Sequence, residues 1–264
     1  MNADRLQEGL RTKLFGRIIL FLREVGSTND LAKELAAYGA VEGTVVVAET
    51  QTAGRGRLGR GWASPKGGLW FSVVLRPELK PAEAVKLVFV AGLAVVEVLR
   101  ELYGVRVETK WPNDVLVKGR KVCGILSEMN TTDGKVNFVV LGIGVNANFL
   151  ENAFPEELKA NATSLESELG RKVKLDALFR TLLERLENLY ELFIREGFNL
   201  ILEEWKKYAG FLGCQVEVTS LTEKMSGLAL DVDQEGALVL RLEGGTITRF
   251  FVGYFSASEV KDNR

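Results

Sequence analysis

Blocks of apolar residues separated by polar turns run along the first 210 residues, and each block predicts a strand or a helix. Three short apolar runs are typical of buried strands: residues 17–24, 43–49 and 67–75. Three longer stretches have capping residues at their ends, or leucines spaced every three to four positions, and predict helices: residues 27–39, 81–104 and 175–197. This alternation is typical of an α/β fold.

Residues 105–146 predict four strands or strand fragments. The apolar runs are interrupted at Lys118-Gly119 and at Asp133-Gly134. Both dipeptides are typical of two-residue hairpin turns, because glycine accepts a positive φ. The stretch is therefore expected to add antiparallel strands to the sheet.

After Gly213, apolar residues no longer recur every three to four positions, so no further helix is expected. Short apolar runs then recur at regular distances between Gly and Asp turns. Such a pattern is typical of a small antiparallel barrel. We therefore expect a boundary near residue 212, with one domain over residues 1–212 and a second over residues 213–264.

Residues 50–66 join two predicted strands and are too long for an ordinary connection. Loops of this length are usually functional or disordered. This one contains GRGRLGRGW at positions 54–62, with Arg55, Arg57 and Arg60 among four glycines. The whole chain has 34 basic and 35 acidic residues and a formal net charge of -1, so it has no general attraction to nucleic acid. The loop predicts a local anion site; a solvated basic turn is the alternative.

The chain contains no histidine, which excludes Ser-His-Asp triads, Cys-His pairs, imidazole-bound zinc and histidine proton shuttles. Chemistry must then come from Lys, Arg, Asp, Glu, Asn and backbone groups. Its two cysteines, Cys123 and Cys214, have neither C-x-x-C spacing nor the density of a disulfide framework. With no secretory signal pattern and no apolar run long enough for a bilayer, a cytoplasmic protein without membrane contact is expected.

Three stretches carry long motifs of rare composition: GSTND at 26–30, ETQTAGRGRLGRGW at 49–62 and KWPNDVLVKGRKVCGIL at 110–126. GIGVN at 142–146 and the small terminal barrel follow in order. In these features the chain resembles the biotin protein ligases. The resemblance implies a class II aminoacyl-tRNA synthetase-like α/β domain with a mixed, largely antiparallel sheet, followed by an SH3-like β-barrel.

The resemblance also implies an activity, the ATP-dependent ligation of biotin to a lysine. Biotin would react with ATP to give biotinyl-5'-AMP, and the acceptor would be a biotin carboxyl carrier protein domain of acetyl-CoA carboxylase or a related carboxylase. Because every group in the first step is anionic, stabilisation must come from guanidinium, ammonium and backbone N–H groups and from Mg²⁺. ATP and Mg²⁺ are thus implied cofactors. No protein ligands to a metal are assigned, and a homodimer is compatible with the resemblance.

The implied biotin site takes residues from all three motifs. Hydroxyl and amide side chains would bind the ureido ring, since a buried ureido group needs paired donors and acceptors. The implied biotin-binding residues are Ser27, Thr28, Asn29, Gln51, Gly54, Arg55, Gly56, Arg57, Lys121, Gly124 and Ile125. By themselves, Ser27 to Asp30 would be interpreted as a helix N-cap, and both roles are compatible.

The implied nucleotide site overlaps the biotin site. Its residues are Arg57, Arg60, Trp62, Asn113, Lys121 and Asn146. The implied catalytic residues are Lys121 at the carboxylate and α-phosphate, Arg57 at the intermediate, and Asp114. Asp114 would steer the acceptor ammonium or accept its proton, because lysine has a reference pKa of about 10.4. Taken singly, Lys121 could be an exposed strand lysine, Trp62 a core residue and Asp114 a turn cap.

Two features separate the chain from many biotin protein ligases. Ser258 stands where many of them carry an arginine that approaches ATP, which leaves the barrel's contribution to nucleotide binding open. Residues 1–15 are too short for a winged helix-turn-helix, so no DNA binding to an operator is expected.

Three other functions are compatible with parts of the sequence. A lipoate–protein ligase would share the catalytic architecture, although the paired GRGRLGRGW and KWPND motifs favour biotin. A nucleic-acid-binding module would use the arginine loop, but no aromatic residues alternate along a basic face. A biotin sensor without ligase activity is the third, and the presence of every core motif residue argues against it.

Overall fold

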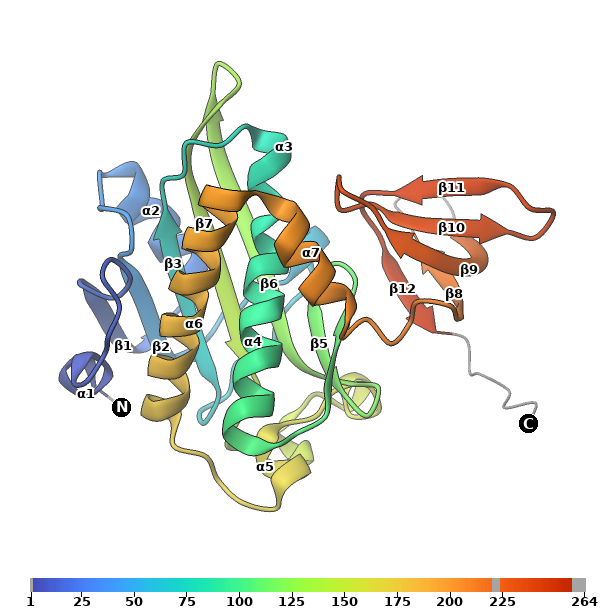
Figure 1. Ribbon diagram of the computed structural model, residues 1–264. Coiled ribbons are helices and arrows are strands. Elements are labelled where there is room, and N and C mark those ends of the chain that lie inside the picture. The colour runs from blue at the N-terminus through green and yellow to red at the C-terminus, as the bar shows by residue number, and fades with distance from the viewer. Residues whose placement is uncertain (1, 220–223, 258–264) are drawn as a thin grey trace.

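A seven-stranded sheet forms the larger part of the protein in the computed structural model, which describes residues 2–219 and 224–257 (Figure 1). Its strand order is β1-β2-β3-β7-β6-β5-β4. The strands are β1 Ile19–Val25, β2 Val45–Gln51, β3 Leu69–Leu75, β4 Val107–Lys110, β5 Asp114–Val117, β6 Arg120–Thr132 and β7 Lys135–Val145. Only β1 and β2 pair in parallel, so the mixed, largely antiparallel sheet expected from the sequence is confirmed.

The helices lie on both faces of this sheet. They are α1 Ala3–Gln7, α2 Thr28–Ala37, α3 Pro81–Ala84, α4 Leu87–Tyr103, α5 Leu165–Leu169, α6 Leu175–Glu196 and α7 Phe198–Lys206, with short 3₁₀ turns η1 Arg57–Gly59, η2 Glu151–Ala153 and η3 Glu156–Leu158. Figure 1 shows α4, α6 and α7 together over one face. On the opposite face, Ala32 and Ala36 of α2 pack against Val46 and Val74.

The single helix expected over residues 81–104 is instead two helices, which corrects that prediction. Between α3 and α4, Lys86 N donates to Glu83 O and Phe89 N donates to Lys86 O. These bonds span three residues instead of four, so the helix tightens locally without leaving helical dihedral angles. Gly104 ends α4 in the left-handed conformation, with φ of 64°, as its position after the apolar run predicted.

The two predicted hairpin turns are confirmed by their dihedral angles. Lys118 and Gly119 have φ of 49° and 77°, and Asp133 and Gly134 have φ of 51° and 74°. Positive φ at both positions is the geometry of a type I′ turn, whose twist matches that of the flanking strands. These turns fix the register of β5, β6 and β7, and so decide which of their side chains share a face.

The C-terminal strands form a separate five-stranded antiparallel sheet in the order β11-β10-β9-β8-β12. They are β8 Gln215–Thr219, β9 Lys224–Val232, β10 Leu238–Leu242, β11 Ile247–Phe250 and β12 Tyr254–Ala257. This sheet contacts the larger one: Trp111 Nε1 donates to Gly236 O at 2.9 Å. A Cβ at Gly236 would lie 3.1 Å from the Phe89 ring of α4. The small C-terminal β-structure predicted from the sequence is confirmed.

Candidate active site

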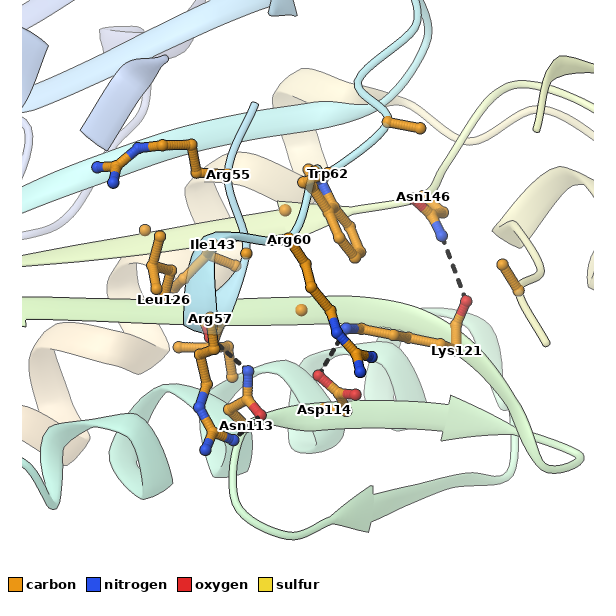
Figure 2. A pocket seen from close by; sticks show the side chains of 18 of the residues that line it. Arg55, Arg57, Arg60, Trp62, Asn113, Asp114, Lys121, Leu126, Ile143 and Asn146 are labelled. Carbon is orange, nitrogen blue, oxygen red and sulfur yellow. Dashed lines mark hydrogen bonds and ion pairs between the residues drawn. The ribbon is translucent and has the colours of Figure 1, made fainter. Parts of the chain in front are cut away.

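A cavity of about 470 Å³ lies over the end of the large sheet, roofed by the arginine loop and bordered by the small sheet. Of the residues assigned to a site from the sequence, all but Gly54 line it. Figure 2 shows side chains from the loop and from strands β5 and β6 directed into the same space. The structure therefore brings together residues that are up to 119 positions apart between Ser27 and Asn146.

The floor of the cavity is a row of residues across four strands. Trp70 of β3 pairs with Gly144 of β7, Gly144 with Gly124 of β6, and Gly124 with Asp114 of β5. A Cβ at Gly144 would lie 2.6 Å from Trp62 Nε1, and one at Gly124 would lie 3.0 Å from the Trp62 ring. The Trp62 indole can therefore lie over the sheet only because both positions are glycine.

A second glycine of GIGVN makes room for a polar side chain. A Cβ at Gly142 would lie 2.0 Å from Asn29 Oδ1. Gly142 pairs with Ser72 on one side and with Leu126 on the other. Because side chains of a strand alternate between its two faces, Gly142 and Gly144 lie on the same face of β7. Together they leave space on that face for Asn29 and Trp62.

The start of helix α2 forms one end of the cavity. Ser27 is its N-cap, and the Ser27 hydroxyl accepts a hydrogen bond from Asp30 N at 3.4 Å. Gln51 Oε1 accepts from Thr28 N at 2.8 Å and from the Thr28 hydroxyl at 3.1 Å, while Gln51 Nε2 donates to Ser64 Oγ at 2.7 Å. The capping role and a place at the cavity are therefore combined, as the sequence allowed.

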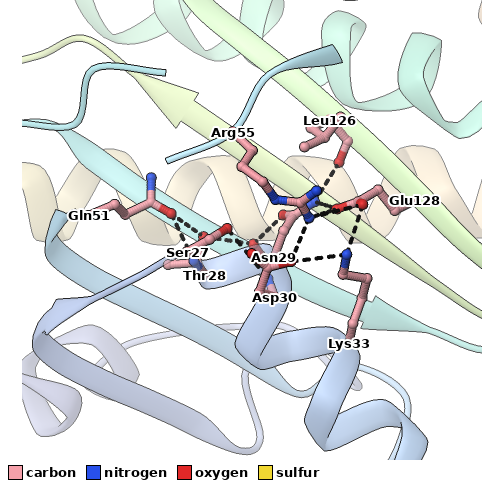
Figure 3. A network of polar contacts seen from close by, with 10 residues as sticks. Ser27, Thr28, Asn29, Asp30, Lys33, Gln51, Arg55, Leu126 and Glu128 are labelled. Carbon is pink, nitrogen blue, oxygen red and sulfur yellow. Dashed lines mark hydrogen bonds and ion pairs between the residues drawn. The ribbon is translucent and has the colours of Figure 1, made fainter. Parts of the chain in front are cut away.

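Gly54 and Arg55 hold the base of the arginine loop. A Cβ at Gly54 would lie 2.5 Å from Trp62 O, so the two ends of the loop approach too closely for a side chain. Arg55 Nη2 lies 2.6 Å from Asp30 Oδ1 and 2.8 Å from Glu128 Oε2 (Figure 3). Arg55 thus binds carboxylates of the protein, and Gly54 is required for the fold of the loop although it does not line the cavity.

Arg57 links three parts of the site. Its Nη1 donates to Asn113 Oδ1 at 2.8 Å, and its Nη2 donates to Gly253 O of the small sheet at 3.4 Å. Asn113 Nδ2 in turn donates to Ile125 O at 2.8 Å. Arg57 therefore spans from the loop to β6 through Asn113, and to the small sheet directly.

Lys121 and Asp114 form an ion pair at the centre of the cavity, with Lys121 Nζ 2.7 Å from Asp114 Oδ1. The angles are not those of a hydrogen bond, since Asp114 Oδ1 has no hydrogen-bond partner among the described residues. The Lys121 ammonium also lies 4.8 Å from the centre of the Trp62 ring, a cation–π contact. The central cation is thus held by a carboxylate and an indole.

Lys110, which is not among the residues assigned from the sequence, also lines the cavity. It is opposite Asp114 in the pairing of β4 with β5. Burial lowers the pKa of the Lys110 ammonium; the Asp114 carboxylate partly counteracts this, and the Lys121 charge adds to it. The signal was present in the sequence, because Lys110 is the first residue of KWPND.

Asn146 and the segment after it form the far wall, which the sequence analysis recognised only at Asn146. Asn146 Nδ2 donates to Lys121 O at 3.3 Å and to Thr163 O at 3.0 Å, and its buried Oδ1 has no hydrogen-bond partner among the described residues. Lys121 N donates to Asn161 O, and Thr163 N donates to Lys121 O. The other residues of this wall are Phe154, Leu158 and Ala162. No motif marks these apolar positions, so only the structure places them.

A cluster of three or more His, Cys, Asp or Glu side chains that could hold a metal ion is absent from residues 2–219 and 224–257. Mg²⁺ in nucleotide sites is commonly held by phosphates and by one or two protein oxygens. The cavity offers the Asp114 carboxylate and Asn146 Oδ1, which has no hydrogen-bond partner among the residues that the structure describes. The residues therefore fit a metal that arrives with a nucleotide and do not form a metal site of their own. In the same ranges, no helix is long and apolar enough to cross a bilayer.

Residues 21–146 match the biotin/lipoate A/B protein ligase family, and residues 211–256 match the C-terminal domain of biotin protein ligases. The bifunctional ligase/repressor BirA of Bacillus subtilis is 38% identical over 93% of this chain and 76% of its own length. The biotin–[acetyl-CoA-carboxylase] ligase of Paracoccus denitrificans is 35% identical over 85% of this chain and 94% of its own. The solved biotin protein ligase from Aquifex aeolicus in complex with biotin and ATP is 31% identical, with a TM-score of 0.78 over 92% of this chain and 100% of that one.

Proposed function

Because this chain belongs to the biotin protein ligase family, we propose how its own residues carry out the two steps of ligation. The enzyme ligates biotin through biotinyl-5'-AMP. Residues 1–212 would form the catalytic domain and residues 213–264 the barrel domain. The observation that carries the proposal is the convergence of Lys121, Asp114 and Arg57 on one cavity beside Trp62.

In the first step a biotin carboxylate oxygen forms a bond to the α-phosphorus of ATP, and the bond to the β-phosphate oxygen breaks to release pyrophosphate. Lys121 would leave Asp114, to which it makes an ion pair without hydrogen-bond geometry, and form charge-assisted hydrogen bonds to the carboxylate and the α-phosphate. Arg57 and Arg60 would bind the phosphates from the loop above. Mg²⁺, held by the phosphates and by Asp114 or Asn146, would neutralise further negative charge.

The end of the cavity at α2 would bind the ureido ring of biotin. Ser27 and Thr28 lie at the helix start, where the first backbone N–H groups have no intrahelical acceptor. Asn29 and Gln51 would act differently, because their amides already bind Ser72, Glu128, Thr28 and Ser64. They would set the positions of the residues that touch the ligand. Gly124 and Ile125 would line the middle of the pocket.

The adenosine would lie between Trp62 and the wall beyond Asn146. The Trp62 indole packs edge to face on Trp70, and its buried Nε1 has no hydrogen-bond partner in the described part of the chain. Asn113 and Asn161, which also line the cavity, would supply polar groups near the adenosine. The barrel contributes Thr219 and Gly253 to the cavity. Ser258 lies outside the described residues.

In the second step the acceptor lysine of a biotin carboxyl carrier domain forms an amide bond with the biotinyl carbonyl carbon, and the bond to the AMP oxygen breaks. With Lys121 bound to the phosphate, Asp114 would be available for the incoming ammonium. Asp114 would steer it and accept its proton. The same carboxylate would therefore bind one lysine of the enzyme before adenylation and the lysine of the carrier afterwards.

Replacing Gly144 with alanine is expected to weaken the binding of biotinyl-AMP about tenfold, because overpacking costs about 1 to 3 kcal/mol. The new methyl group would lie 2.6 Å from Trp62 Nε1 and displace the indole. The melting temperature should change little, since the loop can yield. Gly26→Ala is the control, because a Cβ there meets nothing within 4 Å. An unchanged affinity of the Gly144 variant would show that the ligand does not need the Trp62 position.

The experiment that tests the assignment compares biotin with lipoate, each with and without MgATP, by thermal shift. We expect biotin to raise the melting temperature and MgATP to increase that shift strongly. When a carrier domain is then added, its mass should increase. A stabilisation by lipoate alone would assign the cavity to the other acid. Tight, salt-sensitive binding to DNA or RNA at the arginine loop would favour a nucleic-acid module.

A further inference from the structure

Four charged side chains form a network beside the cavity, at its biotin end (Figure 3). Glu128 on β6 is at its centre and does not itself line the cavity. Lys33 Nζ lies 2.8 Å from Glu128 Oε1 and 3.0 Å from Asp30 Oδ1. Arg55 binds both carboxylates, at 2.6 Å to Asp30 and 2.8 Å to Glu128. Two positive and two negative charges thus balance at this point.

Glu128 also fixes the orientation of a cavity residue. Asn29 Nδ2 donates to Glu128 Oε2 at 2.9 Å and to Leu126 O at 3.2 Å, which uses both of its donors. Asn29 Oδ1 accepts from Ser72 Oγ at 2.6 Å. If Glu128 lost its charge, the Asn29 carboxamide would lose its strongest acceptor and could rotate.

The network reaches from Asn29 to the residues around it. Ser72 Oγ lies 2.8 Å from Thr28 Oγ1, which is 3.1 Å from Gln51 Oε1. Four residues at the biotin end are therefore joined by polar contacts to one another and, through Asn29, to Glu128; the hydroxyl protons of Ser72 and Thr28 fill two of the three oxygen–oxygen contacts at a time. Gly142 lies beneath Asn29 and makes room for the carboxamide, because a Cβ at that position would lie 2.0 Å from Asn29 Oδ1.

Glu128 is also tied to the arginine loop. Arg55 is two residues before Arg57, and the isolated bridge between Arg55 and Gly61 closes the loop at its base. Through Arg55, the carboxylate of Glu128 anchors this base to β6 and α2. Burial raises the pKa of the Glu128 carboxyl, but hydrogen bonds from Lys33, Asn29 and Arg55 outweigh it and lower the pKa below its ordinary value. The anchor is therefore charged at neutral pH.

We propose that Glu128 is a positioning residue that sets the biotin-binding residues of α2 and the base of the arginine loop in one fixed arrangement. This inference rests on the proposed function, because it needs biotin at the α2 end of the cavity. The carboxylate does not touch the ligand. It acts through Asn29 on one side and through Arg55 on the other.

Glu128→Gln is the direct test, since glutamine has the same shape and keeps one acceptor. Isothermal titration with biotin alone should give a dissociation constant raised about tenfold, as a charge-assisted hydrogen-bond network is weakened. The dissociation constant for ATP alone should rise by a smaller factor, because the network reaches the nucleotide residues of the loop only through Arg55. A larger loss for biotin than for ATP would not follow from a general loss of stability.

Glu97→Gln is the matched control. Glu97 of α4 binds Arg185 Nη1 at 2.6 Å, and its side chain is 20% exposed, compared with 23% for Glu128. Glu97→Gln should reduce the melting temperature about as much as Glu128→Gln does, but it should leave the dissociation constant for biotin unchanged. Lys33→Gln should give a smaller loss of biotin affinity than Glu128→Gln, because it leaves the contacts of Asn29 and Arg55 intact.

The outcomes separate this inference from the proposed function. If the unaltered enzyme binds biotin and Glu128→Gln binds it equally well, the positioning role is wrong and the proposed function stands. Equal losses for biotin and ATP would also overturn the positioning role, since they would indicate a general structural effect. If the unaltered enzyme fails to bind biotin, the proposed function itself fails.

Discussion

Replacing Lys121 with alanine is expected to slow adenylation by roughly ten- to a hundredfold while the free energy of unfolding changes by less than about 1 kcal/mol. The lost charge-assisted contact to the phosphate is worth about 1.5 to 3 kcal/mol in the transition state. In the empty cavity Lys121 has a partly exposed ion pair with Asp114 and a cation–π contact with Trp62, and at partly exposed sites each of these contributes about 0 to 1 kcal/mol to stability. Pyrophosphate release and urea unfolding measure the two effects separately.

Lys118→Ala is the matched control for Lys121. Lys118 lies on the turn that precedes it, and its ammonium is 3.0 Å from Glu168 Oε2. Lys118→Ala removes a lysine ion pair from the same hairpin, but Lys118 does not line the cavity. If the Lys121 variant kept its adenylation rate and lost much of its stability, Lys121 would be structural, and the central cation of the proposed mechanism would have to be Lys110.

Arg57→Gly is expected to release biotinyl-AMP roughly ten- to a hundredfold faster than the unaltered enzyme. The variant should still form some biotinyl-AMP. Lys121 and Mg²⁺ would carry the remaining adenylation. The variant loses a charge-assisted contact to the intermediate, worth about 1.5 to 3 kcal/mol. It also loses the bonds from Arg57 to Asn113 and to Gly253 of the barrel, which close the loop over the cavity.

The released anhydride would acylate exposed lysines without selection, so the Arg57 variant should biotinylate a bystander such as serum albumin. Lys66→Gly is its control, since it removes an exposed cation from the same loop and adds a glycine. Equal dissociation rates of preformed biotinyl-AMP and equally clean carrier labelling in both variants would show that Arg57 does not retain the intermediate.

The strands, the main helices and their turns were predictable because local chemistry decides them. Lys118-Gly119 specifies a turn, and Gly104 ends a helix, whatever the rest of the chain does. Helix α7 had no such marker, because it follows α6 after a single glycine, Gly197.

The site was predictable where a motif concentrates unusual residues, and less so where the function of a residue depends on its neighbours in space. Arg57 and Lys121 were assigned through their motifs, and both line the cavity. The reason for Gly142 and Gly144 became visible only after strand pairing placed them under Asn29 and Trp62. Arg55 was assigned to the ligand, although its guanidinium binds Asp30 and Glu128, which are distant in sequence.

The most direct test of the account is the amount of pyrophosphate released by the enzyme with biotin and MgATP before any acceptor is present. The cavity contains every group that the proposed first step needs, so we expect a rapid burst of pyrophosphate that matches the amount of protein. The biotinyl-AMP should remain bound until a carrier domain is added. Pyrophosphate release that begins only when the carrier is added would contradict the proposed mechanism.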